Sequence, residues 1–529
     1  MSEALSAAVE RTTAQVRDLY IRVNLAGWDA ATTGTPEALD AAAATRADWM
    51  RYWADPDAYR QFKEWDESNA AGGDAQLKRI VHVLHLGFAE GQRDPATIDE
   101  MTELAKALDD AHTNFRAEVD GERLTANAIV EVLRSENDSD KRRAVWEASK
   151  AIGPRIADQI RRLAELRNQA AHAMGYKNFH HMSLTLNELD PDWLFAMLDE
   201  LAAKTDEPFR QAKAEMDAEL SARFGVPVED LMPWHYAEPF FQQAPMSNRY
   251  DFNAVFEGRD LVDLALKTYD GLGLEVGDIL ERSDLYEREG KDQHAFCMHA
   301  DREGDVRTLC NLKPTLRWME TLLHELGHGV YDKYIPKELP WMLRTVPHIL
   351  TTEAMAMLMG SETLDPEWHA EVLGAPADEA ERAGAAGFAR MRLEELIFAR
   401  WVMVVVNFER LMYEDPSRDL DALWWELVEK YQFLNAPEGR EHQPDWATKY
   451  HIALAPAYYQ NYLLGRMMSL QWDGWLREHA GGIVGRTAAG DFFRERIFAP
   501  GNTMHWNDAL EFATGEKLNP DYFVQKFAQ

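Results

Sequence analysis

Residues 314–334 read PTLRWMETLLHELGHGVYDKY, and their spacing predicts one long helix. Apolar side chains recur every three or four positions, a pattern that is typical of a helix with one buried face. These side chains are Leu316, Met319, Leu322, Leu323 and Leu326. Pro314 suits the first turn of a helix and Pro336 marks its far limit, so we expect the helix to lie between these two prolines.

The same stretch contains His-Glu-Leu-Gly-His at residues 324–328. On a helix, His324 and His328 lie one turn apart on one face, so both imidazoles can reach one zinc ion at about 2.0–2.1 Å. Glu325 is offset by one position, so it can reach a water on the ion without ligating the ion. Gly327 leaves room for another element to approach closely. Because a five-residue pattern also arises by chance, other residues must support the site.

Glu353 is the candidate third ligand. It lies in PHILTTEAMAMLMG, residues 347–360, where Pro347 opens a second apolar helix. Four apolar residues follow Glu353, and a carboxylate in such a run is costly unless it is paired or metal-bound. Glu362 is the competing ligand, but it lies beyond Gly360, where the helix is expected to end. We therefore favour Glu353.

This ligand set predicts a single catalytic zinc ion and the hydrolysis of an amide bond. Zinc lowers the pKa of its water towards about 7, and Glu325 accepts the proton that this water releases. The resulting hydroxide attacks a carbonyl group that the ion polarises, and Glu325 returns the proton to the departing amine. A further hydrogen-bond donor should stabilise the developing oxyanion.

Helical patterns dominate the rest of the chain, which predicts a mostly α fold. The pattern in residues 126–150 is interrupted at residues 137–140, where a run of good N-cap residues starts a second helix. Further helical patterns cover residues 156–173, 192–223, 391–414 and 420–431.

One segment, residues 294–312, breaks the helical pattern. Two apolar stretches flank a turn-rich stretch at residues 300–305, which predicts a small β-hairpin just before the metal motif. An edge strand beside a cleft can bind an extended peptide through main-chain hydrogen bonds. The alternative is a hairpin that only connects its neighbours.

The composition excludes several classes of partner. The 529 residues include 56 Lys and Arg against 90 Asp and Glu, so the formal net charge of −34 repels nucleic acid and anionic lipid. With 46% hydrophobic residues the chain can still form large cores. Its two cysteines are too few for a disulfide framework.

The sequence also favours the cytoplasm. The first residues lack a basic segment followed by an apolar one, so they do not resemble a secretory signal. The longest strongly apolar run, residues 401–406, is far shorter than the roughly 18 residues of a membrane span. We therefore expect a cytoplasmic protein with no membrane partner. The sequence does not indicate an oligomeric state.

A downstream segment, residues 449–471, reads KYHIALAPAYYQNYLLGRMMSLQ. It begins with Lys-Tyr-His-Ile and continues with Pro456 and two tyrosines three apart, Tyr459 and Tyr462. Together with the HELGH motif and Glu353, this segment is similar to the angiotensin-converting-enzyme-type peptidyl-dipeptidases. The resemblance implies an elongated, mostly helical metallopeptidase with a deep central channel. It also implies that residues 1–529 form a single peptidase domain whose two helical halves flank that channel.

The resemblance implies a role for each matching residue. His324, His328 and Glu353 would bind the zinc ion, and Glu325 would act as general base and acid. His451 and Tyr462 would stabilise the oxyanion. Lys449 and Tyr459 would bind the C-terminal carboxylate of a peptide, and the strand residues His299 and Ala300 would hold its backbone. Spacing alone would favour the interpretation of the two tyrosines as core aromatics, and of Lys449 as a solvated surface lysine.

Two departures from the family pattern concern the carboxylate-binding residues. The interval from His451 to the tyrosine pair is one residue longer than in the family, so Tyr458 competes with Tyr459 for its role. The glutamine that helps the family to hold the substrate carboxylate has no clear match around residues 232–236.

Two more departures concern the ions. The family has an aspartate that supports a zinc histidine one turn after the third ligand, whereas this chain has Met357. The support of that histidine must therefore be built differently. Asn461 stands where chloride-responsive members have an arginine, so the sequence does not indicate whether chloride activates the protein.

A second resemblance competes with the first. The segments HAFC, TLLHELGHG and AYYQNY are similar to oligoendopeptidase F and thimet oligopeptidase, which share the zinc chemistry. We expect a zinc metallopeptidase that releases C-terminal dipeptides from short peptides, because of the Lys-Tyr-His-Ile segment. The alternatives are internal cleavage of short peptides and, in a different class, a catalytically silent peptide-binding protein. Intact ligands and an intact base argue against the silent protein.

Overall fold

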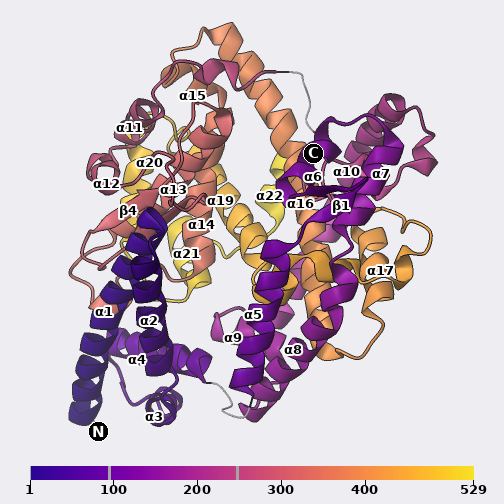
Figure 1. Ribbon diagram of the computed structural model, residues 1–529. Coiled ribbons are helices and arrows are strands. Elements are labelled where there is room, and N and C mark those ends of the chain that lie inside the picture. Colours follow the sequence, from indigo (N-terminus) through magenta and orange to yellow (C-terminus); the bar gives the residue numbers. More distant parts are fainter. Residues whose placement is uncertain (1, 93–96, 246–249, 529) are drawn as a thin grey trace. The chain divides into compact units, whose positions relative to one another are not determined.

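The computed structural model in Figure 1 describes residues 2–92, 97–245 and 250–528. The described chain is mostly helical and carries two small antiparallel hairpins. It forms two compact units. Unit 1 comprises Met1–Gln92, Arg249–Phe388 and Leu464–Tyr522, and unit 2 comprises Arg93–Asn248, Ala389–Leu463 and Phe523–Gln529.

Four helices open unit 1: α1 (Ser2–Thr33), α2 (Pro36–Trp53), α3 (Pro56–Glu67) and α4 (Ala75–Gly91). α1 packs against α2 and α3 packs against α4. Proline at the first turn of α2 and α3, and side-chain caps on α2, α3 and α4, fix where these helices begin. Their apolar faces share one core with the short helix η4 (Trp341–Leu343).

The remaining elements of unit 1 include α13 and α14, which pack against each other. These elements are η3 (Ala254–Phe256), α11 (Leu261–Leu272), α12 (Gly277–Arg282), β3 (Phe296–His299), β4 (Val306–Leu309), α13 (Leu316–Tyr334), α14 (Ile349–Ser361), η5 (Glu362–Leu364), α15 (Pro366–Glu371), α20 (Thr487–Phe492), η8 (Phe493–Phe498) and α21 (Trp506–Thr514).

The predicted metal-motif helix is α13, and all five of its predicted apolar residues are buried. Its N-cap is Thr315, whose hydroxyl accepts a hydrogen bond from the Trp318 backbone N–H. The prediction that Pro314 lies in the first turn is therefore wrong, because the proline precedes the cap. The helix ends at Tyr334, before Pro336, as expected.

The predicted second apolar helix is α14, which packs against α13 (Figure 1). Its N-cap is His348, so Pro347 precedes the cap and does not open the helix as predicted. The expected role of Gly327 is confirmed. A Cβ at this position would lie only 2.8 Å from the Cα of Ala356, so a side chain would force the two helices apart.

The predicted hairpin next to the metal motif is confirmed as β3 and β4, which pair from Phe296 opposite Leu309 to His299 opposite Val306. Both strands pack against α13. A second hairpin, which the sequence analysis missed, lies in unit 2 and joins β1 (Ala117–Val119) to β2 (Glu122–Leu124).

Unit 2 contains the pair of helices that the sequence predicted at residues 126–150, and helices at the other predicted positions. Its elements, besides β1 and β2, are α5 (Ile98–Asn114), α6 (Ala126–Ser135), α7 (Ser139–Ser149), α8 (Gly153–Ala173), α9 (Phe179–Leu186), α10 (Pro191–Phe224), η1 (Val228–Asp230), η2 (Pro233–His235), α17 (Leu420–Gln432), η6 (Arg440–His442), η7 (Asp445–Thr448) and α18 (Tyr450–Leu454).

Three helices contain a boundary between the units: α16 (Ala377–Glu414), α19 (Gln460–His479) and α22 (Asp521–Phe527). α16 begins earlier than the residue 391 that the sequence pattern predicted. The apolar run at residues 401–406 lies in the buried part of α16. Among the residues that the structure describes, no helix combines the length and apolar character needed to cross a membrane.

Candidate active site

α13 and α14 bring together the three predicted zinc ligands of unit 1. His324, His328 and Glu353 each offer one candidate ligand atom, and these atoms all lie within 4.8 Å of one another. His324 Nε2 is 3.9 Å from Glu353 Oε2, and the centroids of the two imidazole rings are 4.9 Å apart. This arrangement is consistent with a metal ion held by two imidazoles and one carboxylate.

The electrostatics of these residues also fit zinc. Burial lowers the pKa of His324 to about 3 and that of His328 to about 4, so both imidazoles are neutral at pH 7. Neutral imidazole is the form that ligates a metal. Burial raises the pKa of Glu353 to about 7, and a bound dication would restore its negative charge.

Thr352 supports one of the histidines. His328 Nδ1 lies 2.7 Å from Thr352 Oγ1, so with an ion on Nε2 the imidazole would donate its Nδ1–H to the hydroxyl. The resembled family supports a zinc histidine with an aspartate, and this chain has Met357 at that position. Thr352 contacts His328 instead. A polar residue directly before Glu353 in an apolar helix was the available signal for this contact.

The predicted base, Glu325, lies between the two histidines on α13 and is buried. Burial and the nearby negative charge of Glu353 raise the pKa of Glu325 to about 8. A hydrogen bond from the Cys297 backbone N–H of β3 opposes this rise. A carboxyl group that titrates near neutral pH is suited to accept and return a proton.

The competing ligand, Glu362, lies outside this group. α14 ends at Ser361, as the position of Gly360 suggested, and Glu362 begins the short helix η5. Its side chain is buried. The ligand atoms that converge are those of His324, His328 and Glu353.

The predicted carboxylate-binding residues meet in unit 2, together with a glutamine. Lys449 Nζ donates a hydrogen bond to Gln242 Oε1 at 3.0 Å, and the Tyr459 hydroxyl lies 3.2 Å from the same oxygen. Trp401 Nε1–H donates to the Tyr459 hydroxyl at 3.0 Å. Sequence reasoning missed Gln242, because it sought the family's glutamine at residues 232–236. The glutamine pair a few residues further on was the available signal.

Lys449 is buried, so its interpretation as a solvated surface lysine is wrong. Its Nζ lies 5.2 to 5.3 Å from the ring centroids of Phe240, Trp401 and Tyr459. Burial lowers the pKa of Lys449 to about 8, and the negative charge of Glu238 partly offsets this effect. A buried ammonium group next to a phenol favours an anionic ligand.

The two predicted oxyanion donors adjoin this cluster. The ring of His451, on α18, is 4.9 Å from that of Tyr459, and the Tyr462 ring is 5.5 Å from Tyr459. Burial lowers the pKa of His451 to about 4, so its imidazole is neutral at pH 7. Tyr458 stacks edge-on with Tyr462, whereas the hydroxyl that reaches Gln242 belongs to Tyr459. This geometry favours Tyr459 as the carboxylate ligand.

The backbone groups of His299 and Ala300 are used within unit 1. The His299 carbonyl accepts a hydrogen bond from the Tyr20 hydroxyl at 2.9 Å. The Ala300 N–H donates to the Asp305 carbonyl at 2.8 Å. Their predicted contact with a substrate backbone stays a prediction, and it requires these groups to change or share their partners.

Two family models match parts of the chain. The model of peptidase family M3 matches residues 132–529, which is well over half of the chain and includes every predicted site residue. The model of angiotensin-converting enzyme matches residues 2–235, which is less than half of the chain. The segment that resembles the peptidyl-dipeptidases, residues 449–471, thus lies in the M3 match. No curated protein matches the chain.

Proposed function

Because the chain belongs to peptidase family M3, it is a zinc metallopeptidase, and we propose that it releases C-terminal dipeptides from short peptides. The observation that carries the specificity is the convergence of Lys449 Nζ and the Tyr459 hydroxyl on Gln242 Oε1. A peptide carboxylate offers the same two donors a pair of negatively charged acceptors, and such charge-assisted hydrogen bonds are the stronger ones.

We assign the chemical step to the residues of unit 1. His324, His328 and Glu353 would hold the ion. When bound, zinc lowers the pKa of a coordinated water and polarises the peptide carbonyl group. The Glu325 carboxylate accepts the proton of the attacking water and then donates it to the amine that leaves when the C–N bond breaks.

We assign the positioning of the substrate to unit 2. Lys449, Tyr459 and Gln242 bind the C-terminal carboxylate, and this fixes which peptide bond is cut. His451 and Tyr462 donate hydrogen bonds to the carbonyl oxygen as its negative charge develops. The neutral state of His451 supports this role. A neutral imidazole still carries one N–H that can donate, and it adds no second positive charge next to the Lys449 ammonium group.

A pair of substrates tests the specificity. One short peptide is supplied as the free acid and as its C-terminal amide, and products are identified by mass spectrometry. We expect dipeptides from the free acid and slow turnover of the amide. The variant Lys449→Met should lose this preference, whereas Lys430→Met, which removes an exposed lysine of unit 2, should keep it. Equal internal cleavage of both peptides would refute dipeptide release.

Internal cleavage of short peptides is the second candidate, and the similarity of HAFC, TLLHELGHG and AYYQNY to oligoendopeptidase F and thimet oligopeptidase supports it. We also propose a cytoplasmic role in the turnover of short peptides, with the whole chain as a single peptidase domain around a channel. A catalytically silent binder of peptides would cleave nothing. Cleavage of a mixed peptide library that a chelator abolishes would therefore support either peptidase hypothesis and argue against a silent binder.

A further inference from the structure

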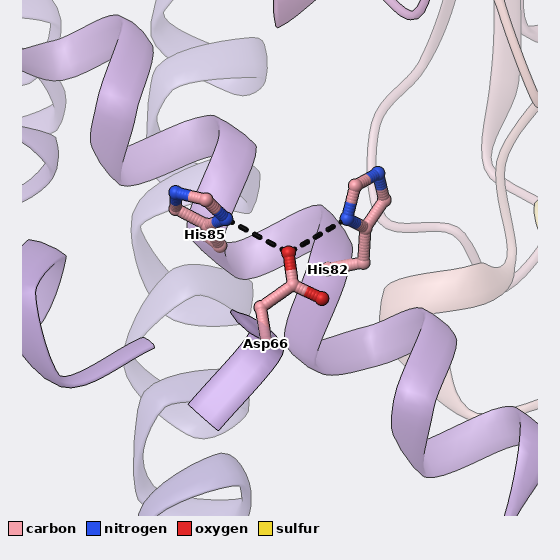
Figure 2. A group of neighbouring side chains, drawn as sticks. All are labelled: Asp66, His82 and His85. Atoms are coloured by element: carbon pink, nitrogen blue, oxygen red, sulfur yellow. Dashed lines mark hydrogen bonds and ion pairs between the residues drawn. The ribbon is translucent and has the colours of Figure 1, made fainter. Parts of the chain in front are cut away.

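A second group of metal-type ligands lies on α3 and α4, the helical pair near the N-terminus of unit 1 (Figure 2). Asp66 is on α3, and His82 and His85 are three positions apart on α4. Each histidine points its Nδ1 at the same carboxylate oxygen, Asp66 Oδ2, at a distance of 2.8 Å. The three candidate ligand atoms all lie within 4.8 Å of one another.

We propose that Asp66, His82 and His85 bind a second divalent transition-metal ion, of the zinc class, that serves structure and not hydrolysis. Two imidazole nitrogens and one carboxylate oxygen are a donor set that zinc takes in proteins, with water in the fourth position. This site goes beyond the proposed peptidase function and does not depend on it.

The distances require only a small adjustment. Ligands at about 2.0–2.1 Å from a tetrahedral ion are separated from one another by roughly 3.3–3.4 Å. Both nitrogens now lie 2.8 Å from Asp66 Oδ2, so each must move away by about half an ångström for an ion to enter. Rotation of the carboxylate and imidazole groups within their side-chain wells can supply such a shift.

The two helices that carry the ligands are held rigidly. Phe62 of α3 stacks on Phe88 of α4 with ring centroids 5.5 Å apart, and both side chains are fully buried in the core of unit 1. Trp65 packs edge-on against Phe62. A metal site is more precise when its ligands stand on elements that are already fixed by packing.

The group is also accessible to an ion. The side chain of His82 is 35% exposed, that of His85 is 15% exposed and that of Asp66 is 16% exposed. An ion can therefore enter from solvent and retain a water ligand. The strongly negative chain raises the local concentration of cations.

The residues between the histidines offer no base of the kind that Glu325 supplies on α13. Val83 and Leu84 occupy the positions between His82 and His85, so this helix offers no acid or base where Glu325 stands on α13. Bound only to the folded chain, an ion here links α3 to α4 and stabilises the unit through binding alone. The competing interpretation is a carboxylate that accepts two histidine hydrogen bonds and binds no ion.

The test counts ions on the full chain. Protein stripped with a chelator is reloaded with excess Zn²⁺, the free ion is removed, and bound zinc is measured by mass spectrometry. We expect two ions on the unaltered chain, and one on both His82→Ala/His85→Ala and His324→Gln/His328→Gln. The matched control His294→Ala, at an exposed histidine, should keep two ions. One ion on the unaltered chain, lost entirely in His324→Gln/His328→Gln, would overturn the proposal.

A second measurement protects the test against misfolding. Asp66→Asn keeps an acceptor for both histidine hydrogen bonds but removes the anionic ligand. It is placed in the His324→Gln/His328→Gln background, where the peptidase site cannot respond. Zn²⁺ should raise the Tm of the background protein and leave the Tm of the Asp66→Asn version unchanged. An equal response of the two proteins, or none in either, refutes the second site without touching the peptidase assignment.

Discussion

The two ligand groups of unit 1 are built from the same parts. Each takes two histidines from one helix and a carboxylate from a helix packed against it. On α13 the histidines are four positions apart with Glu325 between them, whereas on α4 they are three apart with apolar residues between them. The comparison shows that the ligands allow an ion to bind, whereas a base next to them, such as Glu325, is needed for hydrolysis.

The two carboxylates also differ in electrostatics. Burial raises the pKa of Glu353 to about 7. Burial alone would raise the pKa of Asp66 as well, but the hydrogen bonds from His82 and His85 lower it below its usual range. Asp66 is thus stabilised as a carboxylate by its two histidines even when no metal ion is bound. Glu353 lacks such partners and needs a metal ion to favour its charged form. We therefore expect the α13–α14 group to bind zinc more tightly than the α3–α4 group.

The largest effect should come from removing the base that distinguishes the two groups. Glu325→Gln should lower kcat by about 10²- to 10⁴-fold, because the amide cannot accept a proton from water. Its zinc content should stay normal, since Glu325 is not a ligand. Turnover is measured on a short peptide and zinc by mass spectrometry, with the exposed Glu338→Gln as a control. Near-normal turnover would remove Glu325 from the mechanism.

The next effect concerns the carboxylate ligand. Glu353→Ala should lose the zinc ion of the α13–α14 site on dialysis, because two imidazoles alone hold the ion weakly. Glu362→Ala is the matched control, since it removes another buried carboxylate near the end of α14 but should retain one equivalent at this site. The reverse pattern would make Glu362 the ligand and would require α14 to be rearranged.

A smaller effect should follow from the support of His328. Thr352→Val removes the hydroxyl that accepts the Nδ1–H of His328 and should weaken zinc binding by about 10- to 100-fold. Thr352→Ser keeps the hydroxyl and should restore the affinity. Competition against a chromophoric chelator gives both dissociation constants. Equal affinities for the valine and serine variants would show that Thr352 only packs.

The sequence was sufficient where the signal is local. The helical periodicity and the HELGH motif predict α13, its buried face and the shared face of His324 and His328, because these features repeat within a few turns. Capping was less well predicted. Pro314 and Pro347 were each expected in a first turn, but both precede an N-cap, since side chains of Thr315 and His348 satisfy the first N–H groups.

The hairpin of β1 and β2 had a signal that was not used. Asp120 and Gly121 both have positive φ, at 52° and 83°, as a two-residue type I′ turn requires. An Asp-Gly pair between short strands is a strong hairpin pattern, so this element was predictable from its sequence.

Other features could not be predicted from local patterns. Gln242 lies 207 positions from Lys449, and Asp66 lies 16 and 19 positions from its histidines. Packing of distant segments brings these atoms together, and no spacing rule covers such pairs. Both clusters form only when distant segments pack together, whereas the zinc ligands followed from one motif and one buried carboxylate.

The smallest effect isolates what burial alone does to a carboxylate. Burial raises the pKa of Glu409 from 4.5 to about 8, although the Ala457 N–H and Arg167 oppose the rise. The folded chain therefore binds this proton more readily than the unfolded chain. The resulting stability is fully present below pH 4.5 and is lost as the pH rises through about 8. Glu409→Gln does not titrate, so the stability of the unaltered chain should fall relative to the variant by at most about 1.4 kcal/mol per pH unit.

Urea unfolding at pH 5.5 and pH 7.5, with chelator present, measures this difference. Parallel pH profiles for the two proteins would mean that Glu409 is already ionised in the folded chain.

The same pair of measurements on Glu353→Gln compares the two buried carboxylates. Without zinc, Glu353 should behave as Glu409 does, because burial raises both pKa values. With zinc bound, the dication should remove the pH dependence at Glu353 and leave that at Glu409 unchanged, since only one of the two carboxylates is a ligand.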